Sequence, residues 1–138
     1  MRALIYSEGQ SSSPFANQSS NIDYVPSNKL ASLPAAVYEE IELIDVVEFD
    51  PNPDILSVAL QKLRHGGLIR IVGTDALQVM RGSETGKLSI SEASKYLLEG
   101  RLRLTSAHDL KNKLTSMNMA VSTVSLGGFR YLVEAHRQ

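Results

Sequence analysis

The chain of 138 residues contains no cysteine and no tryptophan, and aromatic residues make up only 6% of it. Without cysteine, disulfides and thiolate metal sites are excluded. No apolar run approaches the length that crosses a bilayer, and the apolar stretch at the start is too short for the core of a signal peptide. We therefore expect a cytoplasmic protein that forms one domain over residues 1–138.

An excess of charge of either sign is also missing, because 14 basic and 15 acidic residues give a formal net charge of -1. The basic residues are scattered, so the sequence carries no electrostatic signal for nucleic acid or for an anionic membrane. The three histidines, His65, His108 and His136, lie on separate segments with no second ligand one helical turn away. This spacing argues against a metal site.

Residues 40–75 carry the strongest structural pattern in the sequence. Residues 41–47 are a short apolar, β-branched run typical of a buried strand, and the apolar stripe over residues 55–63 predicts an amphipathic helix. Gly66 is expected to end that helix with a positive φ, and residues 68–72 predict a second strand. Since such crossovers are nearly always right-handed, the stretch predicts a βαβ unit with two parallel neighbouring strands.

Shorter patterns on either side complete the predicted architecture. Strands are expected at residues 3–6 and 22–26, separated by a long polar loop that is either functional or flexible. After the βαβ unit we expect a helical turn, helices capped by Ser91 and Ser106, and two strands around Gly127-Gly128. The predicted fold class is α/β, with a mostly parallel sheet and a C-terminal antiparallel hairpin.

Two nucleotide-binding patterns are incomplete in this sequence. Residues 82–89 resemble a phosphate-binding loop, but only three residues separate the two glycines, and Leu88 stands where a hydroxyl side chain must follow the lysine. The dinucleotide pattern G-x-G-x-x-G is also absent, because only Gly9 follows the first predicted strand. We therefore interpret residues 82–89 as an ordinary surface loop.

Acidic residues recur at the predicted strand ends. In an open α/β sheet the carboxyl ends of the strands line the ligand crevice, so acids there indicate a polar small molecule with hydroxyl or amine groups. For each of them, helix capping or loop solvation is the alternative interpretation. The residues are Glu8, Asp23, Asp45 with Glu48, and Asp75.

Four short segments within residues 39–75 follow one another in a familiar order. They are Glu39-Glu40-Ile41, Val46-Val47-Glu48-Phe49, Leu63-Arg64-His65-Gly66-Gly67 and Thr74-Asp75. Their order and spacing resemble the signature of the Rossmann-like class I S-adenosylmethionine-dependent methyltransferases. A helix near His108 and the hairpin through Gly128 extend the resemblance, whereas the N-terminal half is reduced, with too few residues for the third strand and helix of the family.

This resemblance implies that S-adenosylmethionine is the cofactor and that it lies across the strand ends. Asp23 matches the acid that holds the ribose hydroxyls in the family. Asp75 and Asp45 are the candidates for orienting or deprotonating a methyl acceptor, which the sequence does not identify. The residues implied to contact the cofactor are Glu8, Gly9, Asp23, Leu30 and Asp45.

Two functions stay open at this point. The chain is either a methyltransferase of reduced size or a non-catalytic protein of the same fold that serves as a structural or partner-binding subunit. An enzyme that consumes the cofactor without transferring its methyl group would need the same site as the first. Loss of the helices that normally cover the sheet would leave apolar surface uncovered, so we expect a homo-oligomer in either case.

Overall fold

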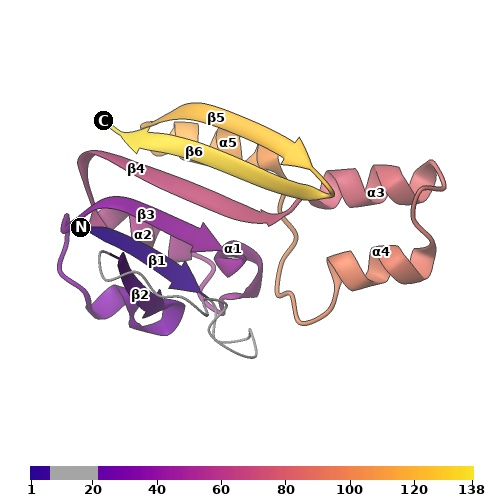
Figure 1. Cartoon of the computed structure of the whole chain (residues 1–138), viewed down its shortest axis with the longest axis horizontal. Helices are drawn as coiled ribbons and strands as arrows, with labels where there is room; N and C mark the ends of the chain where they lie inside the picture. The colour runs from indigo at the N-terminus through magenta and orange to yellow at the C-terminus, as the bar shows by residue number, and fades with distance from the viewer. Residues whose placement is uncertain (7–21) are drawn as a thin grey trace.

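The structure is a computed structural model that describes residues 1–6 and 22–138. Six strands form one mixed sheet in the order β2-β1-β3-β4-β6-β5 (Figure 1). The first four strands run parallel, β6 pairs antiparallel with β4, and β5 pairs antiparallel with β6, which confirms the predicted fold class. The strands are β1 (Arg2–Tyr6), β2 (Ile22–Pro26), β3 (Tyr38–Ile44), β4 (Leu63–Thr74), β5 (Met119–Gly127) and β6 (Arg130–Arg137).

Helices α2 and α5 lie behind the sheet in Figure 1, whereas α3 and α4 extend beyond its end as an antiparallel pair. None of the helices in the described part of the chain has the length and apolar character needed to cross a membrane. The helices are η1 (Ser27–Ser32, a 3-10 helix), α1 (Val46–Phe49), α2 (Ile55–Lys62), α3 (Ala76–Glu84), α4 (Ile90–Leu97) and α5 (Ala107–Ser116).

The main hydrophobic core fills the space between the sheet and helices α2 and α5. Successive side chains of a strand point to opposite faces, so only alternate residues reach this core. Ile41 and Leu43 of β3 and Ile69 and Ile71 of β4 are fully buried in it. A second, smaller cluster holds α3 against α4.

The opposite face of the sheet carries charged side chains between its apolar ones. Guanidinium nitrogens of Arg70 in β4 lie 3.0 Å from a carboxylate oxygen of Glu134 and 3.8 Å from one of Glu42. The Nε of Arg2 lies 2.7 Å from a carboxylate oxygen of Glu40. Among residues 1–6 and 22–138, no helix packs on this face (Figure 1). Ion pairs make this side of the central strands compatible with water, so the expected uncovered apolar surface does not lie on this part of the sheet.

Three predicted boundaries differ from the structure. The strand predicted for residues 41–47 ends at Ile44, because the chain turns at residue 45 and residues 46–49 form α1. Gly66 has the expected positive φ of +78°, but it lies inside β4, since α2 already ends at Lys62. Ser89 caps α4 in place of Ser91, through a capping box with the helix's first turn.

The C-terminal hairpin is confirmed. Gly128 and Phe129 occupy its tight turn with φ of +57° and +64°, as a two-residue turn that matches the strand twist requires. The Phe129 ring lies 5.3 Å from the Tyr96 ring of α4, centroid to centroid. The turn of the hairpin therefore attaches the α3–α4 pair to the end of the sheet.

Candidate functional site

The carboxyl ends of β1, β3 and β4 meet at one edge of the sheet, and β6 begins at the same edge. Strand β1 lies between β2 and β3 in the sheet. After β1 the chain adds β2 on one side of it, and it then crosses over to add β3 on the other side. Such a reversal of strand order is a topological switch point, where open α/β sheets leave a crevice for ligands. The carboxyl ends of β1 and β3 thus form the candidate site.

Asp45 directly follows β3 at this crevice. Its φ of +55° is a left-handed conformation that aspartate tolerates better than most residues, and it turns the chain from β3 into α1. Both carboxylate oxygens accept hydrogen bonds from the Arg130 guanidinium, at 2.7 and 3.2 Å. This bidentate pair links β3 to the first residue of β6 and fixes the orientation of the carboxylate.

Glu48 lies one helical turn further along, and its side chain is only 1% exposed. One carboxylate oxygen accepts a hydrogen bond of 2.7 Å from the Tyr131 hydroxyl, while the other has no partner among the described residues. Burial raises the pKa of Glu48 to about 7, and the nearby Asp45 carboxylate raises it further, against the opposing effects of Tyr131 and Arg101. An acid with this pKa takes up and releases its proton near neutral pH.

Arg101 connects the segment after α4 to the strand ends. Its guanidinium donates a hydrogen bond of 2.9 Å to the Thr74 hydroxyl and lies 4.8 Å above the centre of the Phe49 ring. It also donates to the Lys95 carbonyl at 3.3 Å, whereas its Nε is buried without a hydrogen-bond partner in the described residues. These contacts anchor the end of α4 beside the carboxyl edge of the sheet.

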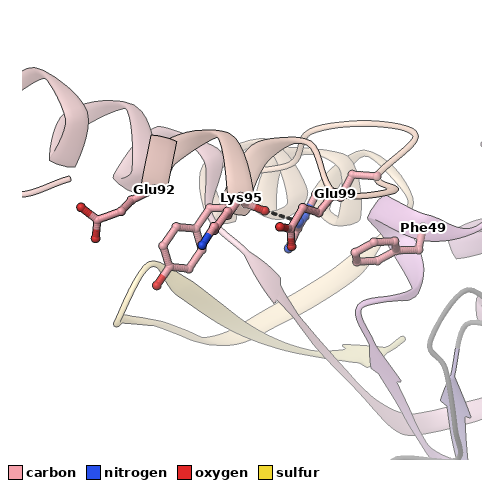
Figure 2. Close-up of a pocket in the computed structure, with 6 residues that line it drawn as sticks. Phe49, Glu92, Lys95 and Glu99 are labelled. Atoms are coloured by element: carbon pink, nitrogen blue, oxygen red, sulfur yellow. Dashed lines mark hydrogen bonds between the residues drawn. The ribbon is translucent and has the colours of Figure 1, made fainter. Parts of the chain in front are cut away.

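A pocket of about 480 Å³ lies where α4 faces the end of α1. In Figure 2, Lys95 and Glu99 lie between Glu92 and Phe49, and the Glu92 carboxylate points away from Phe49. The lining combines two aromatic rings with two acidic and two basic side chains, so it offers both stacking surface and charged hydrogen-bonding groups. The lining residues are Phe49, Glu92, Lys95, Tyr96, Glu99 and Arg101.

Asp75, predicted to act on a methyl acceptor, is 3% exposed, and its carboxylate accepts hydrogen bonds from the first turns of two helices. One carboxylate oxygen accepts a hydrogen bond of 3.0 Å from the Gln78 amide at the start of α3. The other accepts one of 2.9 Å from the buried Ala107 amide at the start of α5. Helix capping, the alternative interpretation for the strand-end acids, is therefore confirmed for Asp75.

Replacing Asp75 by alanine is expected to lower the free energy of unfolding by about 2–4 kcal/mol, because one helix cap is lost and a buried amide is left without a partner. Urea denaturation measures the loss. Asp75→Asn keeps one acceptor oxygen, so its free energy of unfolding should lie between those of the wild type and Asp75→Ala. A stability change below about 0.5 kcal/mol, within the range of neutral surface changes, would contradict the capping role.

Two other predicted cofactor residues, Asp23 and Leu30, do not gather with Asp45. Asp23 is the second residue of β2 and pairs in register with Ala3, so its placement at the carboxyl end of a strand is wrong. Its carboxylate accepts a hydrogen bond of 3.0 Å from the Tyr38 hydroxyl. The Leu30 side chain is fully buried in the main core. Glu8 and Gly9 lie outside the described residues.

No protein-family model and no curated protein sequence matches the chain. Solved structures do match it. A SAM-dependent methyltransferase of Methanosarcina mazei superposes with a TM-score of 0.62 at 12% identity, over 99% of this chain and 92% of that protein. The chain has the class I methyltransferase fold. A SAM-dependent methyltransferase of Thermotoga maritima, described as a possible histamine N-methyltransferase, gives 0.58 at 14% identity over 85% of this chain.

The matching methyltransferases are longer than this chain by different amounts. The chain spans 64% of the length of the Thermotoga maritima protein. It spans 36% of PigF, whose structure contains SAH, with a TM-score of 0.54 at 17% identity over 85% of this chain. At these identities the likeness establishes the architecture, and the chemistry has to be argued from the residues of this chain.

Proposed function

We propose that the protein binds S-adenosylmethionine at the carboxyl ends of β1 and β3 and transfers the methyl group to an acceptor held between α1 and α4. The observation that carries the proposal is the strand order, which puts a switch point between β1 and β3. The matching solved structures that are SAM-dependent methyltransferases support the choice of cofactor.

The chemistry of the described residues fits this cofactor. S-adenosylmethionine supplies an electrophilic methyl group on a positively charged sulfur, and it also carries an ammonium group. Asp45 provides a carboxylate at the crevice, fixed by Arg130 and 15% exposed, which suits a cationic group. Glu8 and Gly9, which follow β1 in the sequence, are further residues that we propose to contact the cofactor.

The pocket beside α4 suits the methyl acceptor. Methyl transfer is a direct displacement, so holding donor and acceptor in line supplies much of the acceleration. Tyr96 and Phe49 offer flat surfaces for an acceptor, and the exposed carboxylate of Glu99 is placed to orient it or to take up its proton. Asp75 supports this arrangement indirectly, by fixing the starts of α3 and α5.

Calorimetric titration with S-adenosylmethionine and S-adenosylhomocysteine tests the proposal. We expect micromolar binding of both ligands, and in Asp45→Asn a loss of affinity of at least roughly tenfold, the equivalent of about 1.4 kcal/mol. Asp23→Asn is the matched control, because its carboxylate lies near the amino end of β2, away from the carboxyl edge, and accepts a hydrogen bond from Tyr38. Loss of binding in Asp23→Asn alone would instead support its predicted role as the ribose ligand.

The same titration separates this function from the non-catalytic alternative. Binding of S-adenosylhomocysteine to the protein would justify a search for acceptors that fill the pocket beside α4. Absence of heat and of any thermal shift at millimolar concentrations of both ligands would contradict the proposal. The chain would then be a subunit that keeps the methyltransferase fold for structural or partner-binding purposes.

A further inference from the structure

The two outermost strands of the sheet, β2 and β5, differ in how well they are protected from pairing with a further strand. Edge strand β2 has five residues, carries the charged Asp23 and ends at Pro26. These are the features by which natural sheets prevent pairing with another strand. Edge strand β5 has nine residues, Met119–Gly127, with no charged residue and no proline, and its register against β6 shifts between Val121 and Thr123, so that residues 123–127 form its regular part. In the described part of the chain, β5 is paired on one side only, with β6 (Figure 1).

Apolar side chains of β5 also lie in solvent. Val124 and Leu126 are 43% and 48% exposed, and they stand in register with the buried Val133 and Tyr131 of β6. They therefore project from the same face as the main core, beyond the part of β5 that α5 covers. A long uncharged edge with exposed apolar residues is a template for one more strand.

We propose that β5 pairs with β5 of a second copy of this chain, antiparallel across a twofold axis, to give one continuous sheet of two copies. Antiparallel pairing of a strand with itself is isologous, so one surface supplies both sides of the contact. The segment carries no charge, and the pairing therefore brings no like charges together. With Ser125 at the axis, residues 123–127 of each copy pair, all beyond the register shift of β5, and they form a ladder of roughly 17 Å at about 3.4 Å per residue.

The side chains select one register of this pairing. Directly opposite residues in an antiparallel pair lie on the same face of the sheet. If Val124 of one copy lies opposite Leu126 of the other, the twofold axis produces this contact twice, once on each side of the axis. The exposed Val124 and Leu126 side chains of both copies are then covered. Ser125 of the two copies then face each other at the axis, on the opposite face. This surface is separate from the proposed cofactor crevice, so the pairing does not depend on cofactor binding.

Sedimentation equilibrium between roughly 1 and 100 μM protein, a range in which specific homodimers assemble, tests the pairing. We expect a dimer whose dissociation constant rises at least tenfold in Val124→Lys, because lysine on an edge opposes strand pairing. Ile90→Lys is the matched control: Ile90 is 76% exposed on α4, beside an apolar pocket of about 370 Å³. A wild-type monomer at every concentration overturns the proposal, as does a dimer lost in Ile90→Lys but kept in Val124→Lys.

The absence of cysteine allows a direct test of register. Ser125→Cys should form an intermolecular disulfide on mild oxidation, since the two residues face each other. Thr123→Cys should not, because its two copies would be four residues apart along the pair, roughly 13 Å, beyond the reach of a disulfide. Crosslinking at Thr123 in place of Ser125 overturns the proposed pairing. Val124→Lys should bind S-adenosylhomocysteine with the affinity of the wild type. This result would show that the β5 surface is separate from the proposed cofactor site.

Discussion

Glutamine in place of Glu48 is expected to stabilise the protein at pH 8 by about 2–3 kcal/mol, although the wild-type residue makes a buried hydrogen bond. The pKa of Glu48 is raised from 4.5 to about 7 by burial, so above pH 7 the folded protein holds a desolvated carboxylate. Each pKa unit corresponds to about 1.4 kcal/mol of stability. A neutral amide of the same size avoids this penalty.

The sign of the pH dependence follows from proton binding. Between pH 4.5 and about 7 the folded protein keeps the proton on Glu48 while the unfolded chain has lost it. The free energy of unfolding therefore falls as pH rises through this window, and the loss is complete above pH 7. Below pH 4.5 both states are protonated, and the glutamine variant loses its advantage.

Urea denaturation of the wild type and Glu48→Gln at pH 5 and pH 8 checks this result. Tyr131→Phe is the companion variant, because the hydroxyl of Tyr131 lowers the pKa of Glu48, and its removal should extend the decline in stability to higher pH and so make the total loss larger. Parallel pH profiles for the wild type and Glu48→Gln would show that Glu48 is ionised in the folded protein without penalty, and the predicted raised pKa would be wrong.

A methyl group at position 73 is expected to cost about 3 kcal/mol of stability or more. A Cβ atom on Gly73 would lie 2.6 Å from the Tyr131 hydroxyl and 2.8 Å from one Glu48 carboxylate oxygen, and closer still to the other. Both neighbours are buried and bonded to each other, so neither has space to move away. Overpacking of a filled interior typically costs 1–3 kcal/mol, and this position belongs at the upper end.

The matched control for Gly73→Ala is Gly127→Ala. Both glycines lie within the last two residues of a strand, but a Cβ at Gly127 would meet no heavy atom within 4 Å. Its stability should change by less than about 0.5 kcal/mol, as for an ordinary surface substitution. Equal thermal midpoints for the two variants would contradict the close packing of Glu48 and Tyr131 against β4.

Local patterns were sufficient to predict the fold. The two strands and the helix within residues 40–75 depend on contiguous runs of apolar residues, and the C-terminal hairpin depends on its Gly-Gly signal, so each is encoded over a few neighbouring residues. The boundary near residue 45 was not predictable in this way. Val46 and Val47 favour a strand by propensity, but the left-handed turn at Asp45 redirects them into α1.

The candidate site was only partly predictable, because its contacts join residues far apart in the sequence. Asp45 was selected correctly as a residue at the carboxyl edge, while its partner Arg130 lies 85 residues away. Glu48 was recognised as an acid near a strand end, but its burial depends on Tyr131, 83 residues further on. No local pattern signals Arg101, which reaches Thr74 from the segment after α4.

The most direct test of the central claim is to map where S-adenosylhomocysteine binds, by following backbone amide resonances of the isotopically labelled protein during titration. We expect the largest shifts at Asp45 and Val46 after β3 and at Thr74 at the end of β4. Amides at the opposite end of the same strands, such as Tyr38 and His65, should stay unchanged. Shifts confined to that opposite end, or none at millimolar ligand, would contradict a cofactor site at the carboxyl edge of the sheet.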